Sequence, residues 1–175
     1  MSKTFQSLGF YNYKLWFTGN IFASSAQWMQ RVAQDWLVLT VLTEGGGLEL
    51  GIVTALQFAP ILLFSAWAGV VADRLDRRHL LQITQTLTAL SGLVLGILVL
   101  SGSAELWMVY ILAFVGGTAG AFDNPVRQAF VSELVPARML PNAVALNSTA
   151  FNSARLIGPA ISGLGIDWVG PGWVF

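Results

Sequence analysis

The chain has 175 residues, of which 55% are hydrophobic and only 10% are charged, and its mean hydropathy of +0.65 is far above that of a soluble globular domain. Nine basic and nine acidic residues balance to a net charge of zero, which lacks the basic excess that nucleic-acid binding requires. The lack of cysteine and the single histidine exclude disulfide frameworks, thiolate metal sites and thiol nucleophiles, so we expect no metal and no cofactor.

Five apolar segments are long enough to cross a bilayer, because about 20 helical residues span about 30 Å of hydrocarbon. The sequence therefore predicts an all-α integral membrane protein, a polytopic helix bundle whose outer face contacts the lipid bilayer. Trp173 begins what looks like a further apolar segment. The expected spans are 15–42, 51–72, 80–103, 106–130 and 143–166, and a sixth begins near 173.

Basic residues lie in alternate connections, and this distribution predicts the orientation. They precede the first span, they lie between the second and third spans, and they flank the connection from the fourth span to the fifth. The other connections carry acidic residues only. Because short basic loops tend to stay in the cytoplasm, we expect a multi-pass protein of the inner or plasma membrane with a cytoplasmic N-terminus.

The first span carries a polar stripe that includes two charged residues, Arg31 and Asp35. Each of them opposes insertion by about 2.5–3.5 kcal/mol at the helix centre, so the stripe must face other helices or a wet cavity. Charged residues inside a membrane often mark a substrate or ion pathway, although a self-neutralising pair four residues apart is the alternative. The stripe covers an arc of about 100° and consists of Asn20, Ser24, Gln27, Arg31, Gln34 and Asp35.

Asp35 is the candidate for carrying a proton, because burial and the neighbouring Arg31 act on its protonation in opposite directions. If water reaches it from alternate faces, its protonation can follow a conformational change. Gln27, Arg31 and Gln34 are the candidates in this span for contacting substrate.

In the third and fourth spans, the Gly92–Gly96 and Gly116–Gly120 spacings predict small-residue packing faces.

The fifth span places another charge, Arg155, near the middle of the membrane. An unpaired arginine there is costly, so we expect it either to pair with Asp35 or another carboxylate, or to receive an anionic group of the substrate. Asn152 lies on the same stripe and joins the pathway candidates. A kinkable, small-faced hinge is expected from the residues that follow, with ordinary tight packing as the alternative, and these are Gly158, Pro159 and Gly163.

Several short motifs occur in order along the chain. The connection at 69–79 has a glycine, an aspartate four residues later, an arginine next and then a basic pair. It resembles the signature loop between helices two and three of the major facilitator superfamily, with Asp76 where that pattern usually has glycine. The segments 122–130, 133–136, 142–147 and 155–159 resemble the branch of that superfamily that contains the enterobactin exporter and macrolide and multidrug effluxers.

The resemblance implies two six-helix halves that rock about a site near the middle of the membrane. This chain resembles the N-terminal half, with five complete spans and the start of the sixth, and its partner is the missing C-terminal half. Helices one, two, four and five are then expected to line the pathway.

The resemblance also implies a cytoplasmic gate that holds the outward-facing form closed. In this gate Arg77 bridges Asp73 to Asp123, while an Asp123–Arg127 pair competes for the same partners. A purely topological role of the basic residues is the alternative. The gate residues are Gly69, Asp73, Arg74, Arg77, Arg78, Asp123 and Arg127.

These features predict a transporter that exports small amphipathic compounds, drug-like or siderophore-like, by alternating access coupled to protons. Two alternatives stay open, namely uptake of a polar metabolite by the same fold and a non-transporting membrane sensor or assembly subunit. No enzyme is expected, because the only histidine lies in a connection and neither an HExxH nor a GxSxG motif occurs.

Overall fold

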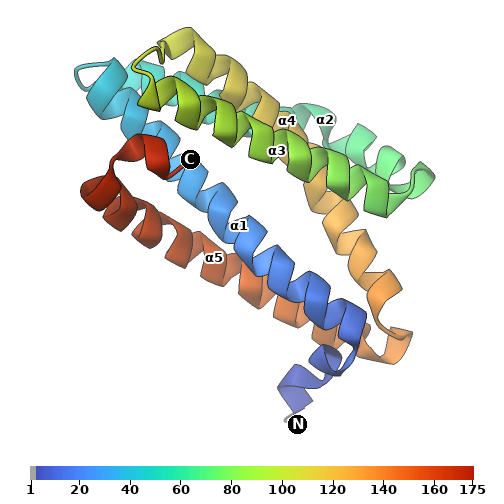
Figure 1. Ribbon diagram of the computed structural model, residues 1–175. Helices are drawn as coiled ribbons and strands as arrows, with labels where there is room; N and C mark the ends of the chain where they lie inside the picture. Colours follow the sequence, from blue (N-terminus) through green and yellow to red (C-terminus); the bar gives the residue numbers. More distant parts are fainter. Residues whose placement is uncertain (1–2) are drawn as a thin grey trace.

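The computed structural model describes residues 3–175, and the described chain is built from helices joined by short turns (Figure 1). The all-helical class predicted from the sequence is confirmed. A 3-10 helix precedes α1, a π-helical turn at Val38–Leu42 extends α1, and short 3-10 turns precede and follow α5. The five long helices are α1 (Tyr11–Leu37), α2 (Gly47–Arg74), α3 (Arg77–Leu100), α4 (Leu106–Leu134) and α5 (Leu140–Val169).

Three of these helices, α2, α3 and α4, are long and apolar enough to cross a membrane. Polar residues lower the mean hydropathy of α1 and α5, so these two helices are not apolar enough to be counted as spans by composition. Both helices nevertheless have the length of a span, with 27 and 30 residues. The composition of the helices therefore indicates a multi-pass membrane protein.

The helices pack in two groups (Figure 1). The first group pairs α1 with α5 along their length, and the second places α4 between α2 and α3. The groups are joined in sequence by the turn from α4 to α5 and by the loop from α1 to α2. This arrangement places polar residues of α1 and α5 opposite α2 and α4.

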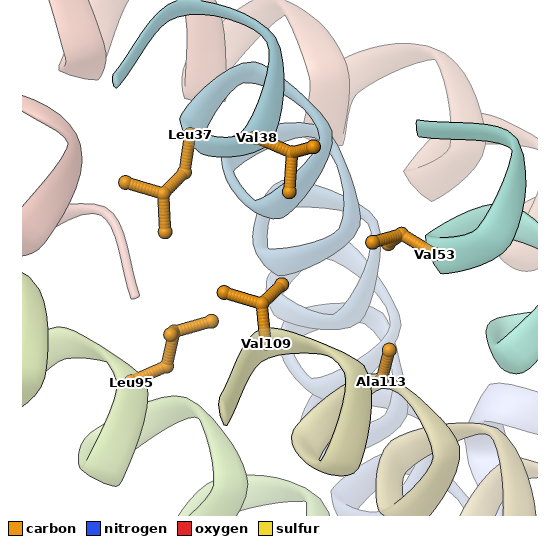
Figure 2. Close-up of a cluster of buried hydrophobic side chains, with 6 residues drawn as sticks. All are labelled: Leu37, Val38, Val53, Leu95, Val109 and Ala113. Atoms are coloured by element: carbon orange, nitrogen blue, oxygen red, sulfur yellow. The ribbon is translucent and has the colours of Figure 1, made fainter. Parts of the chain in front are cut away.

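Two apolar clusters connect the two helix groups, one near each end of α1. At one end, side chains of α1, α2, α3 and α4 meet in a cluster in which each is at most 2% exposed (Figure 2). Since lipid tails are as apolar as these side chains, the cluster stabilises the bundle by close packing rather than by removal from water. At the other end, Tyr13 of α1 is fully buried and donates a hydrogen bond to the Ala143 carbonyl of α5 at 2.9 Å.

Glycines allow the closest helix approaches. A β-carbon on Gly117 of α4 would lie 2.6 Å from the Gln57 carbonyl oxygen of α2, and one on Gly158 of α5 would lie 2.9 Å from the Ser25 carbonyl oxygen of α1. The predicted faces at Gly92 and Gly96 do meet neighbours, at 3.1 Å each. On α4 the prediction is wrong in detail: Gly116 and Gly120 meet only one side-chain atom each at 3.9 Å, and Gly117 makes the close contact instead.

Candidate functional site

A cavity of about 340 Å³ lies among α1, α2, α4 and α5, with one residue of α3 at its edge. Gln27, Arg31 and Gln34 of the α1 stripe and Arg155 of α5 line it together, so four of the five pathway candidates meet in one place. The fifth, Asn152, lies outside this cavity. It lines an adjoining cavity of about 550 Å³ between α1, α4 and α5, and its amide donates to the Ser148 carbonyl of its own helix at 2.8 Å.

Arg31 lies between two aromatic rings. Its guanidinium carbon is 5.1 Å from the centre of the Trp28 ring and 4.8 Å from the centre of the Phe58 ring. A guanidinium at this distance is attracted by the ring quadrupole. Among the ion pairs of residues 3–175, none joins Arg31 to Asp35 directly, although the two opposite charges on α1 still attract each other.

Asp35 contacts an amide rather than a guanidinium. Gln57 of α2 donates to Asp35 Oδ1 at 3.4 Å and to Gln34 Oε1 at 3.2 Å. Gln34 in turn donates to the Val109 carbonyl of α4 at 3.2 Å. The carboxylate thus lies in a polar chain that links α1, α2 and α4 beside the cavity.

Arg155 reaches the cavity from α5. Its guanidinium carbon lies 5.4 Å from the centre of the same Trp28 ring that Arg31 contacts. In the described part of the chain it forms no ion pair with a carboxylate, so the expected pairing with Asp35 does not occur there. Two guanidinium groups from different helices therefore share one indole.

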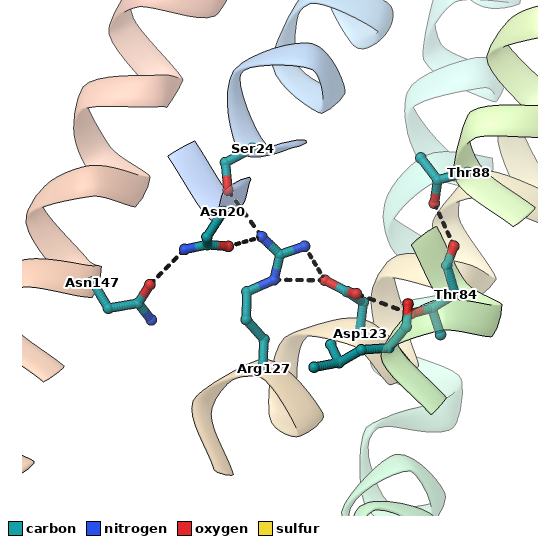
Figure 3. A network of polar contacts seen from close by, with 8 residues as sticks. Asn20, Ser24, Thr84, Thr88, Asp123, Arg127 and Asn147 are labelled. Carbon is teal, nitrogen blue, oxygen red and sulfur yellow. Dashed lines mark hydrogen bonds and ion pairs between the residues drawn. The ribbon is translucent and has the colours of Figure 1, made fainter. Parts of the chain in front are cut away.

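A second polar cluster is centred on Arg127 (Figure 3). Its Nε donates to Asp123 Oδ2 at 2.8 Å, and its Nη1 donates to Asn20 Oδ1 and, at 3.0 Å, to Ser24 Oγ. Thr84 donates to the other oxygen of Asp123 at 2.9 Å. The Asn20 amide also donates across to α5 at 2.7 Å. The network thereby joins four helices through Asn20 and Ser24 of α1, Thr84 of α3, Asp123 and Arg127 of α4, and Asn147 of α5.

Sequence reasoning found only part of this network. Asn20 and Ser24 belong to the α1 stripe, and Asp123 and Arg127 are a pair four residues apart, but Thr84 and Asn147 were missed as partners. A buried threonine most often bonds to its own helix, as Thr84 also does with the Leu81 carbonyl, so its sequence context carries no signal of a distant partner. For Asn147, a polar amide inside an apolar span was such a signal.

The loop between α2 and α3 forms a separate charge cluster. Arg77 donates to Glu133 near the end of α4 at 2.7 Å and lies 3.9 Å from Asp73. The bridge from Arg77 to Asp123 that the resemblance implies is not present, because Arg127 and Thr84 hold Asp123 inside the bundle. Glu133, which was not among the residues predicted for the gate, takes the place of Asp123 as the partner of Arg77. Gly69 is half-buried in α2, whereas Arg74 and Arg78 are exposed.

Asp76 explains how this loop turns without glycine. Its φ of −61° lies in a region open to any residue, and its side chain caps α3 by accepting a hydrogen bond from the His79 backbone N–H at 3.0 Å. That bond holds the pKa of Asp76 below its ordinary value, and His79 adds a smaller electrostatic effect in the same direction. The departure from the usual loop pattern is thus compatible with a well-formed helix start.

The expected hinge on α5 has two unlike glycines. Gly158 packs directly on α1, where a β-carbon would lie 2.7 Å from that of Trp28, whereas a β-carbon on Gly163 would meet nothing within 4 Å. The α-helix continues through Pro159. Within residues 3–175, no group of three potential metal ligands lies close enough together to hold an ion.

Known proteins resemble this chain over most of its length. The profile of a family described as transmembrane secretion effector matches residues 3–175. The staphyloferrin A transporter of Staphylococcus aureus is 34% identical over 122 residues, which are 69% of this chain and 30% of that protein. Macrolide efflux protein A of Streptococcus pyogenes is 31% identical over 105 residues, 59% of this chain and 26% of that protein.

The multidrug efflux pump Tap of Mycolicibacterium fortuitum is 32% identical over 105 residues, 60% of this chain and 25% of that protein. No solved structure matches the chain significantly. The matched region spans less than a third of each of these relatives. The family match nevertheless covers almost every residue and confirms the resemblance found in the motifs. The chain belongs to the transmembrane secretion effector family of the major facilitator superfamily, a family of membrane transporters and not of enzymes.

Proposed function

We propose that this chain is the N-terminal half of a twelve-helix transporter that exports small amphipathic compounds by alternating access. The observation that carries the proposal is the polar cavity among α1, α2, α4 and α5 in a member of a transporter family. The names of the relatives point the same way, because one is a staphyloferrin A transporter and two are efflux proteins. We place the substrate pathway along Gln27, Arg31, Gln34, Asn152 and Arg155.

A groove on the other side of α1 supports a six-helix half. It has a volume of about 490 Å³ and runs between α1 and α3. Small residues line it, including Ala26, Gly92 and Gly96, and small residues let helices approach closely. The turn Pro171–Trp173 brings Phe175 against this groove, beside Gly92. A sixth span that starts here packs on α1 and α3.

The distribution of charge supports a cytoplasmic N-terminus and a gate at the cytoplasmic end. In this proposal the Asp123–Arg127 network holds α1, α3, α4 and α5 together on the cytoplasmic side of the cavity. At the surface, Arg77 at the start of α3 contacts Asp73 at the end of α2 and Glu133 near the end of α4. The neighbouring gate residues Gly69, Asp73, Arg74 and Arg78 complete the cytoplasmic cluster. Bending at Gly158 and Pro159, with Gly163 one turn further along, changes the width of the cavity.

Asp35 is proposed as the proton-coupling residue, because it is the carboxylate beside the cavity and it accepts a hydrogen bond from an amide rather than from an arginine.

The test uses inside-out vesicles that contain the complete transporter polypeptide. Accumulation of fluorescent amphipathic compounds of negative, zero and positive charge is driven by a pH gradient. We expect Asp35→Asn to lower the gradient-dependent accumulation about tenfold or more at matched expression.

Asp167→Asn is the matched control, since Asp167 is exposed near the end of α5 and its loss should leave accumulation unchanged. Equal gradient-driven accumulation by wild type and Asp35→Asn would remove Asp35 from the coupling step. Accumulation in right-side-out vesicles alone would indicate uptake. No accumulation of any compound in either orientation would support a sensor or assembly subunit.

A further inference from the structure

We infer that the cavity recognises an anionic group of its substrate, with Arg31 and Arg155 as the binding residues beside the Trp28 ring that both contact. The inference rests on the proposed transport function and adds a substrate class to it. That class is a small compound with a carboxylate or similar oxyanion attached to an apolar or aromatic body.

The two arginines come from different helices and contact the same ring. Arg31 comes from α1 and Arg155 from α5, and their guanidinium carbons lie 5.1 Å and 5.4 Å from the centre of one Trp28 ring. Gly158 fixes this arrangement, because the lack of a side chain there lets α5 rest on the backbone of α1 beside Trp28. A single oxyanion placed beside the indole edge can therefore be approached from two helices.

The hydrogen-bond donors of both arginines are free for a ligand. A guanidinium carries five N–H donors, and a contact with an aromatic ring leaves most of them for hydrogen bonds. Within residues 3–175, neither arginine forms an ion pair, and neither donates a hydrogen bond to a side chain or carbonyl. No buried side-chain nitrogen of the described residues lacks a partner, so the unused nitrogens of Arg31 face open space.

The charge of the cavity wall also favours an anionic group. The described lining contains two arginines and no aspartate or glutamate. Asp35 is the nearest carboxylate along α1, and Gln57 holds it beside the cavity without making it part of the lining. The two positive charges of the lining outnumber the single negative charge of Asp35 beside it, so the cavity repels a cationic substrate and attracts an anionic one. Both effects strengthen where water is scarce.

The remaining wall suits an apolar body. Phe58, Ile61 and Leu112 line the cavity next to the arginines, and Phe151 packs edge-on against Trp28 with 6.2 Å between ring centres. Binding pockets of this kind combine a mainly apolar lining with a few polar groups that fix orientation. Bidentate guanidinium donors are the groups that best match the geometry of a carboxylate.

The test measures binding rather than transport, so it stays informative if proton coupling fails. Three probes with the same fluorophore differ in charge: dansylglycine is anionic, dansylamide is neutral and dansylcadaverine is cationic. Energy transfer from tryptophan to the dansyl group reports their affinities for the purified complete transporter in detergent. We expect dansylglycine to bind about tenfold more tightly than dansylamide, and dansylcadaverine to bind most weakly.

Arg31→Gln and Arg155→Gln should each weaken dansylglycine binding about tenfold and change dansylamide binding less than about twofold. Arg138→Gln, in the exposed turn before α5, is the control for loss of a positive charge and should leave all three affinities unchanged. Gel filtration of each variant checks its folding. The inference is overturned if wild type does not prefer dansylglycine or does not bind it saturably, or if the arginine variants weaken all three probes equally. Gradient-driven transport that persists in that case leaves the proposed function standing.

Discussion

Asp123 and Arg127 form an ion pair that is almost completely buried, at 2% and 6% exposure. Such a pair contributes little when both members are replaced by well-packed neutral residues, but removing one member leaves a buried charge without its counter-charge. Arg127→Gln should therefore lower the free energy of unfolding by about 3–5 kcal/mol. Unfolding in mixed micelles, followed by the loss of the helical circular dichroism signal, measures this change.

The double variant Asp123→Asn/Arg127→Gln is the decisive comparison. It removes both charges and keeps amides that can still reach Thr84 and Asn20, so most of the lost stability should return. If its loss of stability equals the sum of the losses in the single variants Asp123→Asn and Arg127→Gln, the two side chains act independently. The network in Figure 3 would then not be a coupled unit.

Asp76 gives a prediction about pH. Because its pKa is lowered in the folded protein, its cap on α3 is complete above the ordinary pKa of about 4 and is lost as the pH falls through the lower, folded-state pKa. The backbone amide signal of His79 in an NMR titration should therefore change with a midpoint below about 4. Asp76→Gly should abolish this titration. Asp73→Asn, which removes an exposed carboxylate that does not cap the helix, should leave it in place.

At the scale of the helices, the contact between α1 and α5 depends on one glycine. Gly158→Ala forces a β-carbon against the α1 backbone, so the two helices must separate, and overpacking of this kind costs about 1–3 kcal/mol. Gly163→Ala adds the same methyl group to the same helix in open space, and its higher helix propensity should stabilise the protein by up to about 1 kcal/mol. The unfolding midpoints of the two variants should move in opposite directions, and equal shifts would contradict this account.

The same two glycines show what the sequence could predict and what it could not. Apolar length and periodicity identify helices because they depend on the chain locally, and the polar stripe of α1 correctly indicated a polar interior. Which glycine makes a close contact depends on the rotation of two helices about their axes, and no spacing motif records that rotation. For this reason Gly117 was missed, and Arg77 was assigned to Asp123 although Glu133 holds it.

For the charged side chains, too, the sequence predicted some properties and not others. Their types and their positions along the helices were readable from the sequence, and four pathway candidates do line one cavity. Their partners were not readable, because an arginine can satisfy its charge with a carboxylate, an amide or a ring at similar distances. Arg31 illustrates this: a carboxylate stands four residues away on its own helix, yet its neighbours are Trp28 and Phe58.

At the scale of the whole molecule, the proposed orientation can be tested because these 175 residues contain no cysteine. Ser103 is exposed between α3 and α4, and Ala137 is exposed between α4 and α5, at opposite ends of α4. Basic residues lie near Ala137 and an acidic residue near Ser103, so the orientation rule places Ala137 in the cytoplasm. Ser103→Cys should therefore react with a membrane-impermeant maleimide in intact cells, and Ala137→Cys should react only after permeabilisation.

The measurement uses the complete polypeptide with any cysteines outside this region replaced, and transport by each variant shows that it is inserted correctly. Labelling of Ala137→Cys alone in intact cells would invert the orientation and place the Arg77–Glu133 cluster on the outer face. Labelling of both in intact cells would mean that α4 does not cross the membrane. The expected pattern instead places the Asp76 cap and the Arg77–Glu133 pair in the cytoplasm. Both then face neutral pH, at which the Asp76 carboxylate is charged and the start of α3 is fully capped.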